Sequence, residues 1–112
     1  MYSEVNALEQ QLSDAKLLVE RRQMAMRLEK NRDFKKLILD EFCVEECARY
    51  ARESANPALT AEQRADALAL AQAAGHLKRF LSVVCQMGNV AEGQMVDINE
   101  AIEEARAEEG AE

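Results

Sequence analysis

Large aromatic side chains are scarce in this chain. Tryptophan is absent, and phenylalanine and tyrosine together make up only 4% of the residues. The 48% hydrophobic share is rich in alanine, which favours helices but buries little apolar area. A core of this kind gains limited stability from burial. We therefore expect part of the apolar surface to pack against a second copy or another protein.

Signals for a membrane, an export route or a disulfide framework are also missing. No run of about 18 apolar residues occurs, so we expect no membrane span. The N-terminus has no basic flank followed by an apolar block, which argues against a secretory signal. Three cysteines cannot all pair within one chain, and a reducing cytoplasm suits them best.

Motifs that carry catalysis are absent as well. The sequence has no glycine-rich phosphate loop, no HExxH and no nucleophile elbow. His76 is the single histidine, and no serine or cysteine stands at a motif-like position that would make it a catalytic base. We predict that the protein is not an enzyme and has no catalytic, cofactor-binding or metal-binding residues.

A zinc site is the strongest alternative to that prediction. Cys43 and Cys47 are four residues apart on one helical face, and Cys85 and His76 could complete a Cys₃His set. The spacing differs from that of the usual zinc knuckle, and all three cysteines lie in apolar faces. Free cysteine is commonly buried, so we favour buried thiols over ligands.

Charge is distributed unevenly along the chain. The net charge is −7, of which residues 93–112 carry −6. Between residues 21 and 36 there are seven bases and two acids, a local charge of +5. This basic segment is either a docking surface for an acidic partner or a solvated helix face. Its bases are Arg21, Arg22, Arg27, Lys30, Arg32, Lys35 and Lys36.

A long amphipathic helix is expected over residues 3–30, with Ser3 as its N-cap. Its apolar residues follow the alternating three- and four-residue spacing of a coiled coil until Arg22 interrupts the pattern. The helix would be about 40 Å long, so we expect partner helices to cover it. The predicted oligomer interface consists of Val5, Leu8, Leu12, Ala15 and Val19, together with Leu70 and Leu77 from a later helix.

A helical body is expected over residues 31–92. Asn31 should cap or bend the chain, and a second helix should follow over 34–54. Asn56-Pro57 should end that helix, and the capping box formed by Thr60 and Gln63 should start a third one that ends near Gly88. The second helix should bury Phe34, Leu37, Ile38, Phe42, Val44, Cys47, Ala48 and Ala51.

The rest of the chain, residues 93–112, reads as an acidic helix and tail that frays after Ala105. Gly75, inside the third helix, is expected to mark a close helix crossing. The fold prediction is all-α: an antiparallel helical hairpin or bundle, with a long coiled-coil-like helix at the N-terminus and an acidic C-terminal tail.

One segment has a familiar form. The run Leu28–Ile38, written Leu-Glu-Lys-Asn-Arg-Asp-Phe-Lys-Lys-Leu-Ile, is followed downstream by the Leu77–Leu81 helix. Together they resemble small helical proteins encoded among the head and packaging genes of tailed bacteriophages. This resemblance covers residues 5–85. It implies a phage setting and a role in virion assembly or host takeover, and it transfers no catalytic residue.

These observations predict a non-enzymatic helical protein that oligomerises and acts in bacteriophage particle assembly, as a scaffold-like factor or a capsid- or portal-associated protein. One alternative is a binder or inhibitor of a host nucleic-acid enzyme or defence protein. Another is a small nucleic-acid-binding module, although the acidic balance argues against it. The expected partners are the protein itself and a phage structural protein or host protein, in the host cytoplasm or on the virion.

Overall fold

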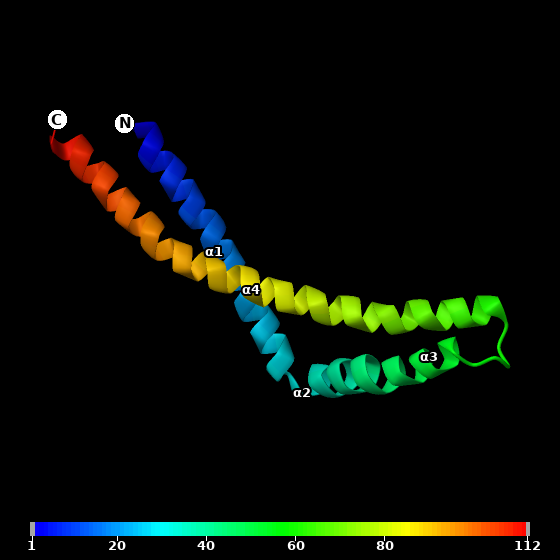
Figure 1. The fold of residues 1–112 in the computed structure, drawn as a ribbon. Helices are drawn as coiled ribbons and strands as arrows, with labels where there is room; N and C mark the ends of the chain where they lie inside the picture. Colours follow the sequence, from blue (N-terminus) through cyan, green and yellow to red (C-terminus); the bar gives the residue numbers. More distant parts are fainter. Residues whose placement is uncertain (1, 112) are drawn as a thin grey trace. The chain divides into compact units, whose positions relative to one another are not determined.

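All the regular structure in residues 2–111, the part of the chain that the computed structural model describes, is helical (Figure 1). The elements are α1 (Tyr2–Lys30), α2 (Arg32–Phe34), the π-helical segment η1 (Lys35–Glu46), α3 (Cys47–Ser54) and α4 (Ala61–Ala111). The all-α prediction is therefore confirmed. Within these residues, no helix is long and apolar enough to cross a lipid bilayer.

The chain divides into two compact units. We call Met1–Ala25 with Val84–Glu112 the terminal unit, and Met26–Val83 the central unit. By sequence, the terminal unit has 12 acidic and four basic residues, a net charge of −8, and the central unit has nine acidic and ten basic residues, a net charge of +1. The acidic character of the protein thus belongs to one unit.

In the terminal unit, the first part of α1 packs against the last part of α4. Glu9 pairs with Arg106, and Arg22 pairs with Glu92. The two segments therefore run in opposite directions, and the start of α1 lies beside the end of α4 (Figure 1). Small side chains fill much of this interface, since its buried residues are Val5, Ala15, Ala25, Val84, Ala91, Ile102, Ala105 and the exceptional Arg22.

The prediction that a helix ends at Gly88 is wrong. Helix α4 runs for 51 residues, from Ala61 to Ala111, and continues through Gly88, Asn89 and the acidic region beyond Ala105. The expected fraying after Ala105 is therefore also wrong for the described residues. Gly88 is buried and faces Arg22, so its lack of a side chain makes room for a neighbour.

The close helix crossing expected at Gly75 lies elsewhere. A Cβ built on Gly75 would meet nothing within 4 Å. At Gly88 the same atom would overlap the Arg22 Cβ and would lie 2.9 Å from the Arg22 Cδ. The helix backbones thus come close together at Gly88.

Helix α1 ends where the sequence suggested a cap or a bend. Asn31 has an extended backbone, with φ −66° and ψ 125°, and its Oδ1 accepts a hydrogen bond of 2.9 Å from the Phe34 amide. Asn31 is therefore the N-cap of the next helical run, and the chain does not continue as one helix. The run begins at Arg32, two residues earlier than predicted.

We expect Asn31→Ala to lower the free energy of unfolding by about 1 kcal/mol, because the Phe34 amide loses its acceptor. Ser13→Ala is a suitable control, since Ser13 is exposed inside α1 and alanine favours helix there. Urea unfolding followed by circular dichroism measures both variants. Equal midpoints for the two would contradict the capping role of Asn31.

The central unit contains a change of helix type that the sequence did not suggest. Residues Lys35–Glu46 form a π-helix, whose i to i+5 hydrogen bonds place more residues in each turn than an α-helix does. Residues on the buried face of this segment therefore recur at intervals longer than the 3.6 residues of an α-helix. Cys43 is buried, while Leu37 and Val44 are 60% and 56% exposed, and Ala48 and Ala51 are also exposed. The 3.6-residue pattern was the wrong one to apply here.

The turn between α3 and α4 follows the sequence signals closely. Helix α3 ends at Ser54, before Asn56 and Pro57. The Thr60 Oγ1 accepts from the Gln63 amide at 3.1 Å, and the Gln63 Oε1 accepts from the Thr60 amide at 2.9 Å. This reciprocal pair is the predicted capping box. It returns the chain so that η1 and α3 run alongside the first half of α4 (Figure 1).

Candidate interaction surface

Most of the residues predicted to meet a second copy are covered within their own unit. Val5 and Ala15 are buried, and Leu8, Leu12 and Val19 are half-buried. The cover comes from residues 84–111 of α4, which complete the terminal unit. In the central unit, Leu77 is half-buried and Leu70 is 43% exposed. Contact of these seven residues with another copy stays a prediction.

Arg22 is the one buried charged residue among those described, and it is 8% exposed. Its Nη1 donates to the Asn89 Oδ1 at 2.8 Å and to the Glu92 Oε2 at 2.5 Å. Its Nε is buried and has no hydrogen-bond partner among the described residues. Arg22, which interrupts the apolar pattern, therefore packs against Gly88 and donates hydrogen bonds to Asn89 and Glu92.

Two ion pairs join α1 to α4 within the terminal unit. Arg22 reaches Glu92, and one end of the unit is joined by Arg106 and Glu9 at 2.6 Å. The second pair is exposed, at 61% and 47% of the side-chain areas, and contributes little to stability. Together the two pairs fix the direction in which these helices meet.

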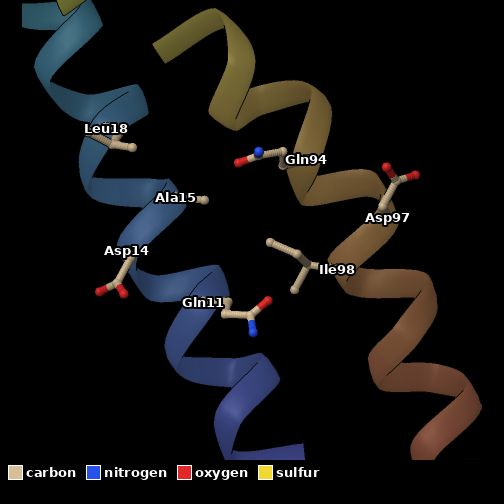
Figure 2. Close-up of a pocket in the computed structure, with 7 residues that line it drawn as sticks. All are labelled: Gln11, Asp14, Ala15, Leu18, Gln94, Asp97 and Ile98. Carbon is tan, nitrogen blue, oxygen red and sulfur yellow. The ribbon is translucent and has the colours of Figure 1, made fainter. Parts of the chain in front are cut away.

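The same pair of helices also leaves open space that none of these four charged residues lines. One hollow of about 390 Å³ lies between them, and Figure 2 shows Ala15 and Ile98 in the space between the two ribbons. The side chains of Asp14 and Asp97 lie on the outer edges, one on each helix (Figure 2). The hollow therefore has Ala15 and Ile98 at its centre, with the amides of Gln11 and Gln94 beside them and an acid on the outer edge of each helix. Its full lining is Gln11, Asp14, Ala15, Leu18, Gln94, Asp97 and Ile98.

A second hollow of about 290 Å³ adjoins the first one. It shares Leu18 and Gln94 with the first hollow, so the two follow one another along the helices. Its lining contains no charged residue, and consists of Leu18, Gln86, Met87, Val90, Ala91 and Gln94. We call the two hollows together the open groove. Met87 and Val90 are 41% and 55% exposed there.

The basic segment divides into one buried residue and an exposed remainder. Arg22 is occupied by Asn89 and Glu92, so it is not free to dock a partner. The other six predicted docking residues are exposed: Arg21, Arg27, Lys30, Arg32, Lys35 and Lys36. Docking of an acidic partner on these six stays a prediction.

The three cysteines and His76, the candidate zinc ligands, all lie within the described part of the chain. No set of three or more histidine, cysteine, aspartate or glutamate residues there could hold a metal ion. Cys43 is buried, and the half-buried Cys47 places its Sγ 3.5 Å from the Ala71 carbonyl oxygen. The zinc alternative therefore gains nothing from the geometry.

An exposed charge cluster in the central unit has a structural explanation. Arg49 donates to Glu46 at 2.5 Å and to Glu53 at 2.8 Å, and its guanidinium lies 4.4 Å from the Tyr50 ring centroid. The hydrogen bond to Glu46 is the main reason why the pKa of Arg49 lies above its ordinary value. Arg49 thus stays protonated and cannot act as a base.

The sequence analysis predicted neither the Arg22 contacts nor the open groove. One signal was available for the first, because the apolar pattern of the N-terminal helix breaks at Arg22. Gly88 of α4, which lies against Arg22, completes that signal. In the sequence alone, however, a glycine at this position predicts a helix end. The groove left no sequence signal, since Met87, Val90 and Gln94 look like ordinary surface positions of a helix.

Comparison with known proteins adds no relative. No family model matches the chain, and neither the curated proteins nor the solved structures compared with it include a match. A function for this chain must therefore be inferred from the surfaces of its helices. They present exposed apolar side chains on two paired helices, which is a surface suited to binding other helices.

Proposed function

We propose that this chain is a non-enzymatic helical protein that oligomerises and acts in bacteriophage particle assembly, as a scaffold-like factor or a protein associated with the capsid or portal. One observation carries the proposal: the interior holds mainly small side chains, while large apolar ones remain outside. In the terminal unit, Ala15, Ala91 and Ala105 are buried, whereas Leu17 and Met24 are 56% and 53% exposed. Such side chains gain free energy when another molecule covers them.

The proposed architecture is an antiparallel helical hairpin whose outer faces bind other helices. Leu17 and Met24 are seven residues apart on α1, so they share one face. The Val5–Val19 stripe already packs against α4, which leaves the Leu17–Met24 face for contact between copies. The phage setting rests on the resemblance of residues 5–85 to head and packaging proteins.

Sedimentation equilibrium should show at least a dimer for the intact chain, and Leu17→Glu with Met24→Glu should shift it towards the monomer. The control is Ser13→Glu with Gln23→Glu, which adds the same charge at exposed positions of the same helix. This control should keep the wild-type mass. A strict monomer at high concentration for the intact chain would overturn the oligomer proposal.

A host-directed binder remains the second candidate, because the terminal unit carries −8 and acidic surfaces can mimic nucleic acid. Affinity capture with the tagged full chain separates the candidates. Stoichiometric recovery of a capsid or portal protein from infected cells supports assembly. Stoichiometric recovery of one host nucleic-acid enzyme or defence protein, in place of a virion protein, supports the binder.

A further inference from the structure

The terminal unit carries a groove that no contact described above uses. The ion pairs Arg22–Glu92 and Arg106–Glu9 join the two helices without lining this groove. The groove consists of two adjoining hollows that share Leu18 and Gln94. The groove spans residues 86–98 of α4, which is about 20 Å of helix. This length matches about four turns of another helix.

The groove's floor is suited to an apolar stripe. Leu18, Met87, Val90 and Ala91 line one half, and Ala15 and Ile98 lie in the other half. The interior between the two helices is filled by small residues, so a third helix would add apolar contacts that this pair lacks. Residues at i, i+3, i+4 and i+7 of an incoming helix would enter such a groove.

The groove's charge selects among possible helices. Asp14 and Asp97 lie on the outer edges of the two helices, one on each side of the first hollow (Figure 2). A long lysine or arginine side chain that extends over either edge from a helix in the groove would approach a carboxylate. The whole unit carries −8, which repels acidic helices and steers basic ones towards it. A second terminal unit entering this groove would bring another −8 next to Asp14 and Asp97, so a basic helix is favoured over a second copy as its occupant.

We propose that the groove formed by Leu18, Met87, Val90, Ala91 and Gln94, with Asp14 and Asp97 on the outer edges of its helices, binds an amphipathic helix of a partner protein that carries lysine or arginine on both sides of its apolar stripe. This inference rests on the proposed function, since it names the class of partner that such an interaction protein recruits. Binding would complete a three-helix arrangement on the terminal unit.

Fluorescence anisotropy with the intact protein tests the proposal. The probe is a labelled helical peptide of about two heptads, which matches the length of the groove, with leucine at a and d and lysine at e and g. A matched peptide carries glutamate at e and g. We expect saturable binding of the lysine peptide and none of the glutamate peptide. Equal binding of both would overturn the charge selection.

The decisive variant is Val90→Glu. Val90 is 55% exposed, so the change leaves folding intact, but it places a carboxylate on the apolar floor and should weaken binding about tenfold or more. The control is Val96→Glu, at a 59% exposed position of α4 outside the groove lining, and it should stay within about twofold of the wild type. Both variants add a negative charge, so general attraction for the lysine peptide cannot explain a loss.

Two outcomes would overturn the inference. If Val90→Glu and Val96→Glu bind the lysine peptide equally, the groove is not the site. If Val90→Glu abolishes self-association in sedimentation and the lysine peptide never binds, the groove holds a second copy. The proposed function fails separately, when the intact chain is a strict monomer whatever the peptide does.

Discussion

Replacing Gly88 by alanine should destabilise the protein by about 2 kcal/mol, although the same change usually stabilises a helix. Alanine favours the helix interior over glycine by about 1 kcal/mol. At Gly88 this gain is outweighed, because the new Cβ would overlap the Arg22 Cβ. That neighbour sits next to the backbone, so the helices must separate, and overpacking of this kind costs about 1 to 3 kcal/mol or somewhat more.

Two other glycines of α4 provide controls with the opposite sign. A Cβ on Gly75 or Gly93 would meet nothing within 4 Å. Gly75→Ala and Gly93→Ala should therefore each stabilise the protein by up to about 1 kcal/mol. Urea unfolding at one fixed protein concentration measures all three variants, because association between copies would otherwise shift the midpoints.

A double-mutant cycle identifies the atom responsible. Arg22→Ala keeps the Cβ, so Gly88→Ala should still be destabilising in that background. Arg22→Gly removes the Cβ, and there Gly88→Ala should become stabilising, like Gly93→Ala. If Gly88→Ala behaves like Gly93→Ala in the wild-type background, the close approach of the two helices at Gly88 does not exist in solution.

Glu92→Ala should lower the free energy of unfolding by about 2 kcal/mol. It leaves the buried Arg22 guanidinium with only the Asn89 oxygen as acceptor, and hydrogen bonds to charged groups contribute about 1.5 to 3 kcal/mol. A fully buried pair would cost about 3 to 5 kcal/mol to break. The Glu92 side chain is 63% exposed, which places the expected value below that range.

Replacing the other partner should have a very different effect. Arg22→Met keeps a long, unbranched stem beside Gly88 and removes the buried charge, so it should be neutral or stabilising. Glu92→Ala added to Arg22→Met should then cost less than about 0.5 kcal/mol, as expected at a surface position. Glu9→Ala is the control for the exposed pair with Arg106 and should change stability by less than about 1 kcal/mol.

Urea unfolding of the wild type, Glu92→Ala, Arg22→Met and the double variant gives the coupling energy between Arg22 and Glu92. A larger loss for Arg22→Met than for Glu92→Ala would show that the arginine stabilises the fold outright. The expected pattern assigns it another role: a polar contact that costs stability and fixes the alignment of α1 on α4. Sedimentation of Arg22→Met should then show additional association states, since an apolar residue in its place no longer specifies one alignment.

Local signals determined much of this molecule. Asn31 caps a helix, Pro57 follows a helix end, and Thr60 with Gln63 form a reciprocal cap, all as the sequence predicts. These devices depend on hydrogen bonds between residues two or three positions apart, so a short stretch of sequence contains both partners. The same holds for the all-α class, which follows from apolar spacing within each segment.

Tertiary contacts decided the rest. Gly88 alone predicts a helix end, and only its contact with Arg22, 66 residues earlier, gives a glycine inside a continuous helix a packing role. The N-terminal stripe likewise predicts cover by another copy, and only the tertiary structure shows that residues near the other end of the chain pack against it. Leu37 and Val44 are exposed in a π-helix, whose turn holds more residues than the α-helix that the apolar spacing predicts.

The open groove, like the pairing at Gly88, depends on tertiary contacts that a short stretch of sequence does not contain. Periodicity along a single helix shows which side chains share a face, but a groove exists only between two helices. Leu18 and Val90 line one hollow although 72 residues separate them, and neither position is unusual in its own segment. The sequence by itself thus determined the helices, their caps and the acidic balance. The antiparallel pairing in the terminal unit decided which faces are covered, because burial depends on contacts between residues that are distant in the chain.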